Sequence, residues 1–232
     1  LGQAEPRFDL RAVFRDGQAL LVRLPKGELG GEAASLLGSL VVSEVWRATL
    51  ARSATPASKR RPVFVYLDEF QEVVRLPLDL GDALAQARGL GVGLVLAHQH
   101  LGQLGADLRA GVLANAGSRV AFRLDHEDAA VIAKRSAGKL RPEDFAHLPP
   151  YNAYVDLVAE GSARGFASAR TRPLGPPVRS MQGVWVENRR RYGVPRTETE
   201  AHLRALIEGP ASNGSSESFG GFGVVPDDGS ES

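Results

Sequence analysis

The chain has 232 residues, and its 28 basic and 27 acidic side chains leave a formal net charge of +1. This length suffices for one sizeable domain, and the balanced overall charge does not by itself indicate a nucleic-acid-binding protein. The absence of cysteine excludes disulfides and thiolate metal sites, and no apolar run reaches the ~18–20 residues of a membrane helix. The chain begins at Leu1 without a signal-peptide pattern, and we interpret it as part of a longer protein.

Short apolar segments alternate with helical patterns along most of the chain. Strands are expected at residues 18–24, 63–67, 92–99 and 118–124. Helices are expected at residues 32–52, 80–91, 107–117 and 125–136, the last with Asp125 as its N-cap. A hairpin is expected over residues 152–171, with its turn at Gly161–Ser162. The alternation predicts an α/β fold, mostly a parallel sheet with helices on both faces.

The C-terminal part of the chain is uneven in charge. Arginines gather between Arg170 and Arg204, and no Lys or Arg follows Arg204. Residues 209–232 are Gly/Ser-rich and acidic, which predicts a disordered tail. We therefore expect residues 1–208 to form the folded part, ending in C-terminal helices.

One glycine-rich segment, "PKGELGG" at residues 25–31, is similar to a phosphate-binding loop. Its Lys26 precedes the glycines, no Ser or Thr follows a lysine there, and no G-x-x-x-x-G-K-[ST] motif occurs in the chain. The helix that starts after it could attract an anion at its N-terminus. We favour the simpler interpretation that these glycines make a tight turn.

Two adjacent carboxylates, Asp68 and Glu69, end the apolar strand predicted at residues 63–67. One interpretation is that the chain has reached the surface there. The other is a Walker B strand, in which the aspartate holds Mg²⁺ through its water shell and the glutamate polarises an attacking water. An unpaired carboxylate is costly to bury, so a partner or an ion would be needed if the site is enclosed.

Two further polar residues are candidates for ligand binding. One ends a strand, where ligands bind in open α/β sheets, and the other lies beside a break in a helix. Gln99 ends the strand predicted at residues 92–99 and can orient a water or sense a phosphate oxygen. Arg88 precedes a glycine break, and its planar guanidinium suits phosphate oxygens. Arg88 alone is most often a surface arginine and Gln99 alone an ordinary strand cap, but the order carboxylate pair, arginine, glutamine favours a nucleotide site. A metal pair of His98 and His100 is disfavoured, since no third ligand is close in sequence.

Three segments together resemble the C-terminal ATPase half of type IV secretion coupling proteins. They are "RPVFVYLDEFQEVVRLP", "DALAQARGLGVGLVLAHQHLGQL" and "VLANAGSRVAFRLDHEDAAVIAKRS". The family comprises conjugative DNA-transfer ATPases of the TraG/TraD kind, which are RecA-like, hexameric, membrane-anchored motors related to FtsK-type translocases. The resemblance covers roughly residues 8–206. The histidines on both sides of Gln99 depart from the smaller neighbours usual at that position.

The resemblance implies roles for four residues. Asp68 matches the Walker B aspartate that serves Mg²⁺, Glu69 the catalytic glutamate, and Gln99 the motif III glutamine. Arg88 stands where such proteins keep an arginine that reaches the nucleotide of the next subunit. The Walker A segment and the transmembrane helices of the family precede the matched region, so they are expected before Leu1.

The resemblance also implies ATP and Mg²⁺ as cofactors of the complete protein. The partners would be the other subunits of a homo-hexamer, DNA, and relaxosome or secretion-channel proteins. The complete protein would lie at the cytoplasmic side of the bacterial inner membrane, anchored through a segment outside this chain, while this part itself is soluble.

Two alternatives remain open at this stage. The chain could be an assembly or partner-recognition module that does not hydrolyse nucleotide. It could instead be a DNA-binding domain that uses the Arg170–Arg204 cluster, with Arg189, Arg190 and Arg191 as candidate contacts.

Overall fold

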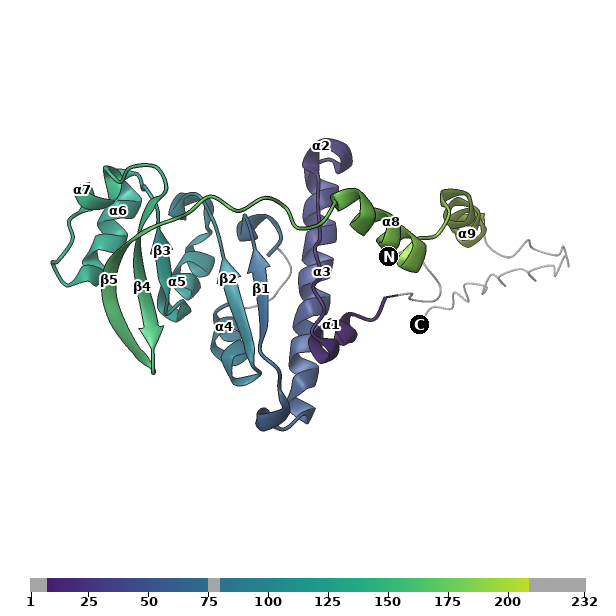
Figure 1. The fold of residues 1–232 in the computed structure, drawn as a ribbon, viewed down its shortest axis with the longest axis horizontal. Helices are drawn as coiled ribbons and strands as arrows, with labels where there is room; N and C mark the ends of the chain where they lie inside the picture. The colour runs from purple at the N-terminus through teal and green to yellow at the C-terminus, as the bar shows by residue number, and fades with distance from the viewer. Residues whose placement is uncertain (1–7, 75–79, 209–232) are drawn as a thin grey trace, which may run out of the picture. The chain divides into compact units, whose positions relative to one another are not determined.

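The computed structural model describes residues 8–74 and 80–208 (Figure 1). The described residues divide into two compact units. The larger unit is Asp9–Pro176, and the smaller unit contains Phe8 and residues 177–208. The tail predicted at residues 209–232 lies outside the described residues.

A pair of parallel strands carries the centre of the larger unit. β1 (Val63–Leu67) and β2 (Val92–Leu96) pair in register from Val63↔Val92 to Leu67↔Leu96. The connection between them contains α4 (Leu80–Gly89), because two parallel strands need a crossover rather than a tight turn. Both strands were expected, and β2 ends three residues earlier than predicted.

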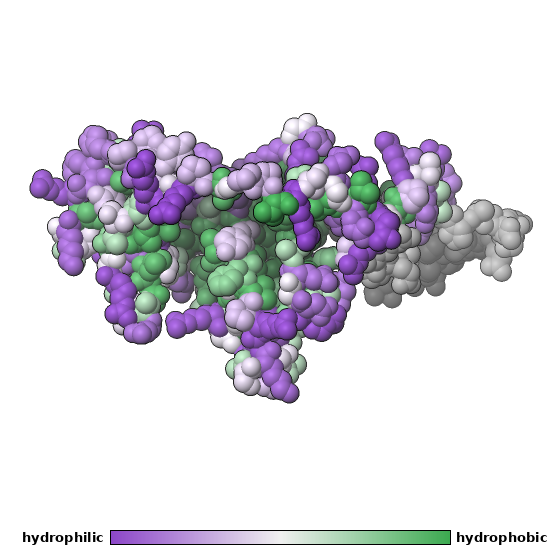
Figure 2. Space-filling model, viewed as in Figure 1, coloured by the Kyte–Doolittle hydropathy of each residue, from purple (hydrophilic) through white to green (hydrophobic). Residues whose placement is uncertain are grey.

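Helices cover one face of this strand pair. Val63, Val65 and Leu94 pack in a core with side chains of α1 (Leu10–Asp16), α3 (Gly31–Ala51) and α4, among them the buried Ala48 and Ala87. The opposite face, which the prediction also covered with helices, is open in the described residues. It carries Phe64, Tyr66 and Val95, which are 64%, 73% and 42% exposed. Figure 2 shows apolar side chains at the surface where β1 and β2 lie.

The larger unit also contains an antiparallel sheet of three strands. Its order is β3-β4-β5, with β3 (Arg119–Ala121), β4 (Asn152–Ala159) and β5 (Ser162–Arg170). The expected hairpin is confirmed, but its turn lies one residue earlier than predicted: Glu160 and Gly161 have φ values of 52° and 79°, the paired positive φ of a twisted two-residue turn, and Ser162 begins β5. The strand expected at residues 118–124 exists, but it extends the hairpin instead of the parallel pair.

Helices α6 (His126–Ala133) and α7 (Pro142–Ala146) cover one side of this antiparallel sheet. Ala129 and Phe145 are both 0% exposed and pack with Ala121, Tyr154 and Phe166. The Asp125 carboxylate accepts a 2.8 Å hydrogen bond from the backbone N–H of Asp128, which confirms the predicted N-cap. The helices of this half of the unit are α5 (Ala106–Asn115), α6 (His126–Ala133) and α7 (Pro142–Ala146).

The N-terminal part of the larger unit is helical. The strand expected at residues 18–24 is wrong: this segment is irregular, and Leu21 is 88% exposed. An apolar segment becomes a strand only where a neighbour pairs its backbone groups, and the described residues offer it none. The helices are α1 (Leu10–Asp16), which was not expected, α2 (Lys26–Leu29), and α3 (Gly31–Ala51), which was. Short 3₁₀ turns are η1 (Arg52–Ala54), η2 (Ala57–Lys59), η3 (Phe70–Glu72), η4 (Leu101–Gln103) and η5 (Lys134–Ser136).

The smaller unit contains two helices and a contact between two aromatic rings. α8 (Met181–Tyr192) and α9 (Arg196–Glu208) are the expected C-terminal helices. The ring of Phe8 lies edge-on to that of Tyr192, with centroids 5.6 Å apart. Within residues 8–74 and 80–208, no helix has the length and apolar character needed to cross a membrane.

Candidate functional site

A strained turn follows β1 and carries the two predicted carboxylates. Glu69 has φ 47° and ψ 48°, the left-handed region that non-glycine residues rarely adopt. The next residue, Phe70, is 0% exposed and packs with Leu101 and Leu104. Its backbone N–H donates a 3.2 Å hydrogen bond to the carbonyl oxygen of Ala97. The buried ring thus holds Glu69 in a conformation that it would not adopt unaided.

The Glu69 carboxylate is held by two amide side chains. Gln99 Nε2 donates to Oε1 at 2.7 Å, and Gln71 Nε2 donates to Oε2 at 2.6 Å. These hydrogen bonds, that of Gln71 first, lower the pKa of Glu69, because they stabilise its charged form. Each carboxylate oxygen keeps a second lone pair, so the ionised group can still accept a hydrogen bond from water.

Asp68 is exposed at the end of the same strand. Within the described part of the chain, its carboxylate has no hydrogen-bond or ion-pair partner. Mg²⁺ in nucleotide sites is commonly held by one or two carboxylates together with phosphates and water. A free carboxylate at this position fits one such ligand, bound directly or through water, and the phosphates would supply the others.

Arg88 lies at the opposite end of the strands from Glu69. It is in the last turn of α4, is exposed, and its backbone carbonyl accepts from the N–H of Gly91, just before β2. A five-residue strand is about 16 Å long at ~3.3 Å per residue. The structure therefore brings Glu69 and Gln99 together and keeps Arg88 away from them.

The histidines on either side of Gln99 have different surroundings. The His98 ring meets the Phe70 ring edge-on at 5.8 Å, and its buried Nδ1 has no hydrogen-bond partner among the described residues. His100 Nδ1 lies 3.1 Å from an oxygen of Asp125.

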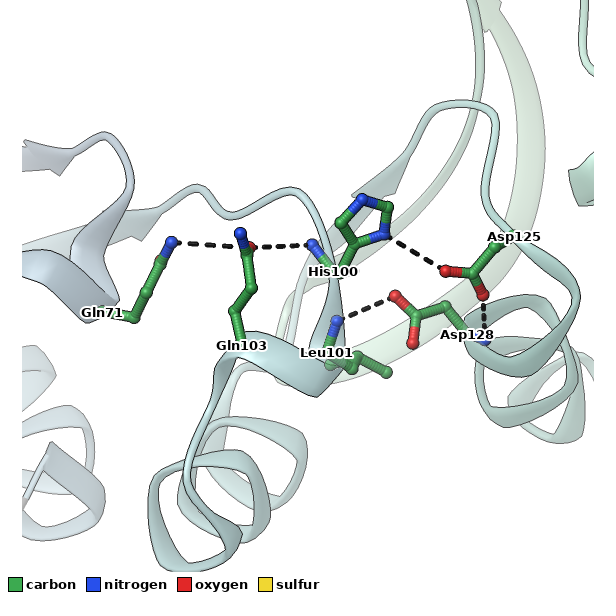
Figure 3. Close-up of polar contacts among 6 residues, drawn as sticks. All are labelled: Gln71, His100, Leu101, Gln103, Asp125 and Asp128. Atoms are coloured by element: carbon green, nitrogen blue, oxygen red, sulfur yellow. Dashed lines mark hydrogen bonds and ion pairs between the residues drawn. The ribbon is translucent and has the colours of Figure 1, made fainter.

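His100, Asp125 and Asp128 bring possible metal-ligand atoms within 4.8 Å of one another. Both carboxylates are already used, however (Figure 3). Asp125 caps α6, and Asp128, 5% exposed, accepts a 2.8 Å hydrogen bond from the backbone N–H of Leu101. The cluster ties the segment after Gln99 to the start of α6.

Gln71, Gln103 and Lys26 lie near Glu69, and the sequence pattern did not predict them as part of the site. Gln71 also reaches Gln103 at 3.5 Å, and the Gln103 oxygen accepts a 3.2 Å hydrogen bond from the N–H of His100 (Figure 3). The only sequence signal for Gln71 was its place two positions after Glu69. Lys26 pairs with Glu72 at 3.1 Å, so the glycine-rich segment at residues 25–31 lies beside the site. That segment makes the expected tight turn, with φ 81° at Gly30.

The three arginines suggested as DNA contacts lie on α8 of the smaller unit. Arg190 forms an ion pair with Glu187 at 2.7 Å, and the Arg191 guanidinium lies over the Tyr192 ring at 5.2 Å. Arg189 is exposed. Two of the three side chains are thus engaged within their own helix.

The carboxylate–glutamine arrangement lies within a segment that matches a known family. Residues 62–140 match the family model described as the TraM recognition site of TraD and TraG. This segment contains Asp68, Glu69, Arg88 and Gln99. The match confirms, over these residues, the resemblance to coupling proteins of the TraG/TraD kind.

Solved structures of the plasmid coupling protein TrwB are similar in fold. TrwB in complex with ADP and Mg²⁺ matches with a TM-score of 0.59 and 21% identity, over 75% of this chain and 45% of that one. TrwB in complex with a GTP analogue matches with a TM-score of 0.55 and 21% identity, over 70% and 43%. The chain thus spans less than half the length of these structures, and the RecA-like α/β fold is confirmed. No curated protein sequence matches the chain.

Proposed function

We propose that this chain is the C-terminal part of the ATPase domain of a conjugative coupling protein, an ATP-driven DNA translocase. The observation that carries the proposal is the 2.7 Å hydrogen bond between Gln99 and Glu69 at the same edge of a parallel strand pair. Ligands bind at this edge in open α/β sheets.

The residues at the site have separable roles in this proposal. Asp68 holds Mg²⁺, and the ionised Glu69 orients and polarises the attacking water. Gln99 links the position of the γ-phosphate to the Glu69 carboxylate. The phosphate-binding loop comes from a segment outside this chain, since no such motif occurs within it.

The proposed assembly follows from the family. The complete protein would work as a homo-hexamer at the cytoplasmic side of the inner membrane, on DNA delivered by relaxosome proteins. Arg88 would then serve the site of a neighbouring subunit, which agrees with its distance from Glu69 in its own subunit.

The central test is Glu69→Gln in the complete protein, with ATP hydrolysis and nucleotide affinity measured on the same preparation. We expect hydrolysis to be lost while nucleotide affinity stays near that of the unaltered protein, because the amide cannot polarise water as a carboxylate does. Glu143→Gln, which alters an exposed glutamate of α7, is the matched control and should hydrolyse normally. Hydrolysis by Glu69→Gln at the unaltered rate would contradict the assignment.

A second function is favoured by the description of the matched family, recognition of the relaxosome protein TraM. In this alternative the chain binds its partner without using nucleotide. Titration of the 232-residue chain with MgATP, and separately with a TraM-type protein, distinguishes the two. The alternative predicts partner binding that Glu69→Gln leaves unchanged, and neither function predicts one-to-one micromolar MgATP binding by this chain alone.

A further inference from the structure

A basic pocket lies at the edge of the β1–β2 pair that is opposite Glu69. Its volume is about 320 Å³, and it is formed by α1, the C-terminal end of α3 and the loop before β1. In Figure 1, α1 lies beside that end of α3. Besides Phe14 and small side chains, its lining is cationic and consists of Arg11, Arg15, Arg52, Lys59, Arg60 and Arg61. None of the lining residues is acidic.

The back of the pocket holds a buried guanidinium without an acidic partner. Arg52 is 8% exposed, and its Nε donates a 2.8 Å hydrogen bond to the carbonyl oxygen of Leu90. Nη2 donates to the carbonyl oxygen of Arg61, and the guanidinium lies 5.5 Å from the Phe14 ring centre. Burial, and then the nearby Arg60, lower the pKa of Arg52. The carbonyl partners satisfy the hydrogen bonds of Arg52 but not its charge, so an anion beside this guanidinium would be stabilised.

Arg60 forms the second fixed cation of the pocket. Its Nε donates to the carbonyl oxygen of Thr55 at 2.8 Å, and its Nη1 donates to that of Gly89 at 2.6 Å. Carbonyl oxygens satisfy the hydrogen bonds of a guanidinium and leave its charge in place. Arg52 and Arg60 therefore form a rigid, positively charged wall.

Three more cations at the pocket are free to meet a ligand. Arg11, Lys59 and Arg61 are exposed, and among the described residues none of their side chains has a hydrogen bond or ion pair. The acids nearest in the chain, Asp9 and Asp16, pair with Arg15 instead. These two carboxylates offset part of the charge, and Asp16 also interacts with Arg61, but the six cations of the lining leave the pocket with an excess of positive charge.

We propose that this pocket binds phosphate groups along the backbone of a nucleic-acid strand. The cations come from three chain segments and outnumber the charge of a single phosphate, so a ligand with regularly spaced phosphates meets more of them. None of the lining residues is an exposed large apolar side chain of the kind that inserts into a bilayer. The ligand class rests on the proposed function in DNA transfer, whereas the test below involves no nucleotide hydrolysis.

The test compares two triple variants of the 232-residue chain with equal loss of charge. The pocket variant is Arg11→Ala, Lys59→Ala and Arg61→Ala; the control is Lys134→Ala, Arg135→Ala and Lys139→Ala, three exposed cations at the end of α6. Binding to a fluorescently labelled single-stranded oligonucleotide is followed by anisotropy across a range of salt. We expect the pocket variant to bind at least about tenfold more weakly. Its log–log salt slope should be smaller by ~2, at ~0.7 for each lost phosphate contact.

The remaining measurements either support the proposed site or overturn it. The thermal midpoint of the pocket variant should not fall, because the three exposed side chains make no hydrogen bonds or ion pairs among the described residues. Equal weakening in both variants would reduce the effect to net charge and overturn the site, as would no binding by the unaltered chain. Pocket-dependent binding to anionic phospholipid vesicles, without oligonucleotide binding, would also overturn it. Glu69→Gln should bind the oligonucleotide normally, so a failure of the ATPase proposal leaves this result readable.

Discussion

Gln99 donates a 2.7 Å hydrogen bond to Glu69, thirty residues earlier in the chain. The two side chains meet because β1 and β2 run parallel and in register, so the residues after both strands emerge at the same edge. A group that displaces Gln99 from this edge therefore changes the hydrogen bonding of Glu69 directly. No intermediate side chain is needed for that coupling.

Gln71 should control the acidity of Glu69 more strongly than Gln99 does. Gln71→Ala removes the hydrogen bond that contributes most to the lowered pKa of Glu69, so this pKa should rise toward the ordinary value of glutamate. Gln99→Ala should raise it less. A carbon-detected NMR titration of the Glu69 carboxyl measures both, with Gln86→Ala, an exposed residue of α4, as a control.

The same shift predicts how stability depends on pH. A carboxyl whose pKa is lowered by folding stabilises the protein above its unfolded pKa, and this contribution is lost as pH falls through the folded pKa. The stability difference between the unaltered chain and Gln71→Ala should therefore be present at neutral pH and shrink under acidic conditions. A difference that grows on acidification would contradict the proposed cause.

Phe70 should be the anchor of the Glu69 turn. Phe70→Ala removes a ring that is 0% exposed, and we expect a loss of about 3–5 kcal/mol in the free energy of unfolding, measured with urea. Phe64→Ala is the matched control: its ring is 64% exposed, and its removal should change stability by less than about 0.5 kcal/mol. Similar losses in both variants would mean that the open face of β1 and β2 is covered in solution.

Asp125 and Asp128 should stabilise the loop after β2 by different means. Asp128→Ala leaves the backbone N–H of Leu101 without its buried partner, at a cost of about 1–3 kcal/mol. Asp125→Ala removes a helix cap, which costs about 1 kcal/mol, whereas Asp125→Asn keeps a capping oxygen and should cost only a few tenths. Because the two residues share one network, the double alanine variant should lose less than the sum. Full additivity by chemical denaturation would argue against the network.

Local patterns in the sequence predicted much of this fold. The apolar run before Asp68, the N-cap at Asp125 and the turn at Gly161 are decided by neighbours in sequence, and each was correct to within one residue. The strand expected at residues 18–24 was wrong because strand formation depends on a distant partner, and the same dependence placed β3 beside β4. The local sequence does not indicate which two strands will pair.

Prediction of the site from the sequence had the same limit. Gln99 and Glu69 could be brought together from strand ends alone, since parallel strands share an edge. Gln71 reaches back to Glu69 only because η3 turns the chain immediately after the strand, and the sequence pattern did not predict this turn. The basic pocket combines α1 with the loop at residues 52–61, and α1 itself was not expected.

Arg88 should act on the site of a neighbouring subunit if the complete protein hydrolyses ATP as a ring. Its position near the start of β2 keeps it away from its own Glu69, so Arg88→Ala should fold and assemble normally but be inactive. Arginines that reach a transferred phosphate from another subunit are worth roughly 10³–10⁵ in rate. Arg88→Lys should recover little, because an ammonium lacks the planar fork of a guanidinium.

Mixing two inactive variants of the complete protein tests whether Arg88 acts between subunits. Arg88→Ala subunits keep Asp68, and Asp68→Ala subunits keep Arg88. In mixed rings some interfaces then pair an intact Asp68 site with an intact Arg88 from the neighbour, and those interfaces should hydrolyse ATP. The measurement is the hydrolysis rate across mixing ratios, with mixed rings verified by light scattering and a pull-down between two tags. An arginine acting within its own subunit gives no recovery at any ratio. An ordinary surface arginine leaves Arg88→Ala active before any mixing, so the three roles give three different curves.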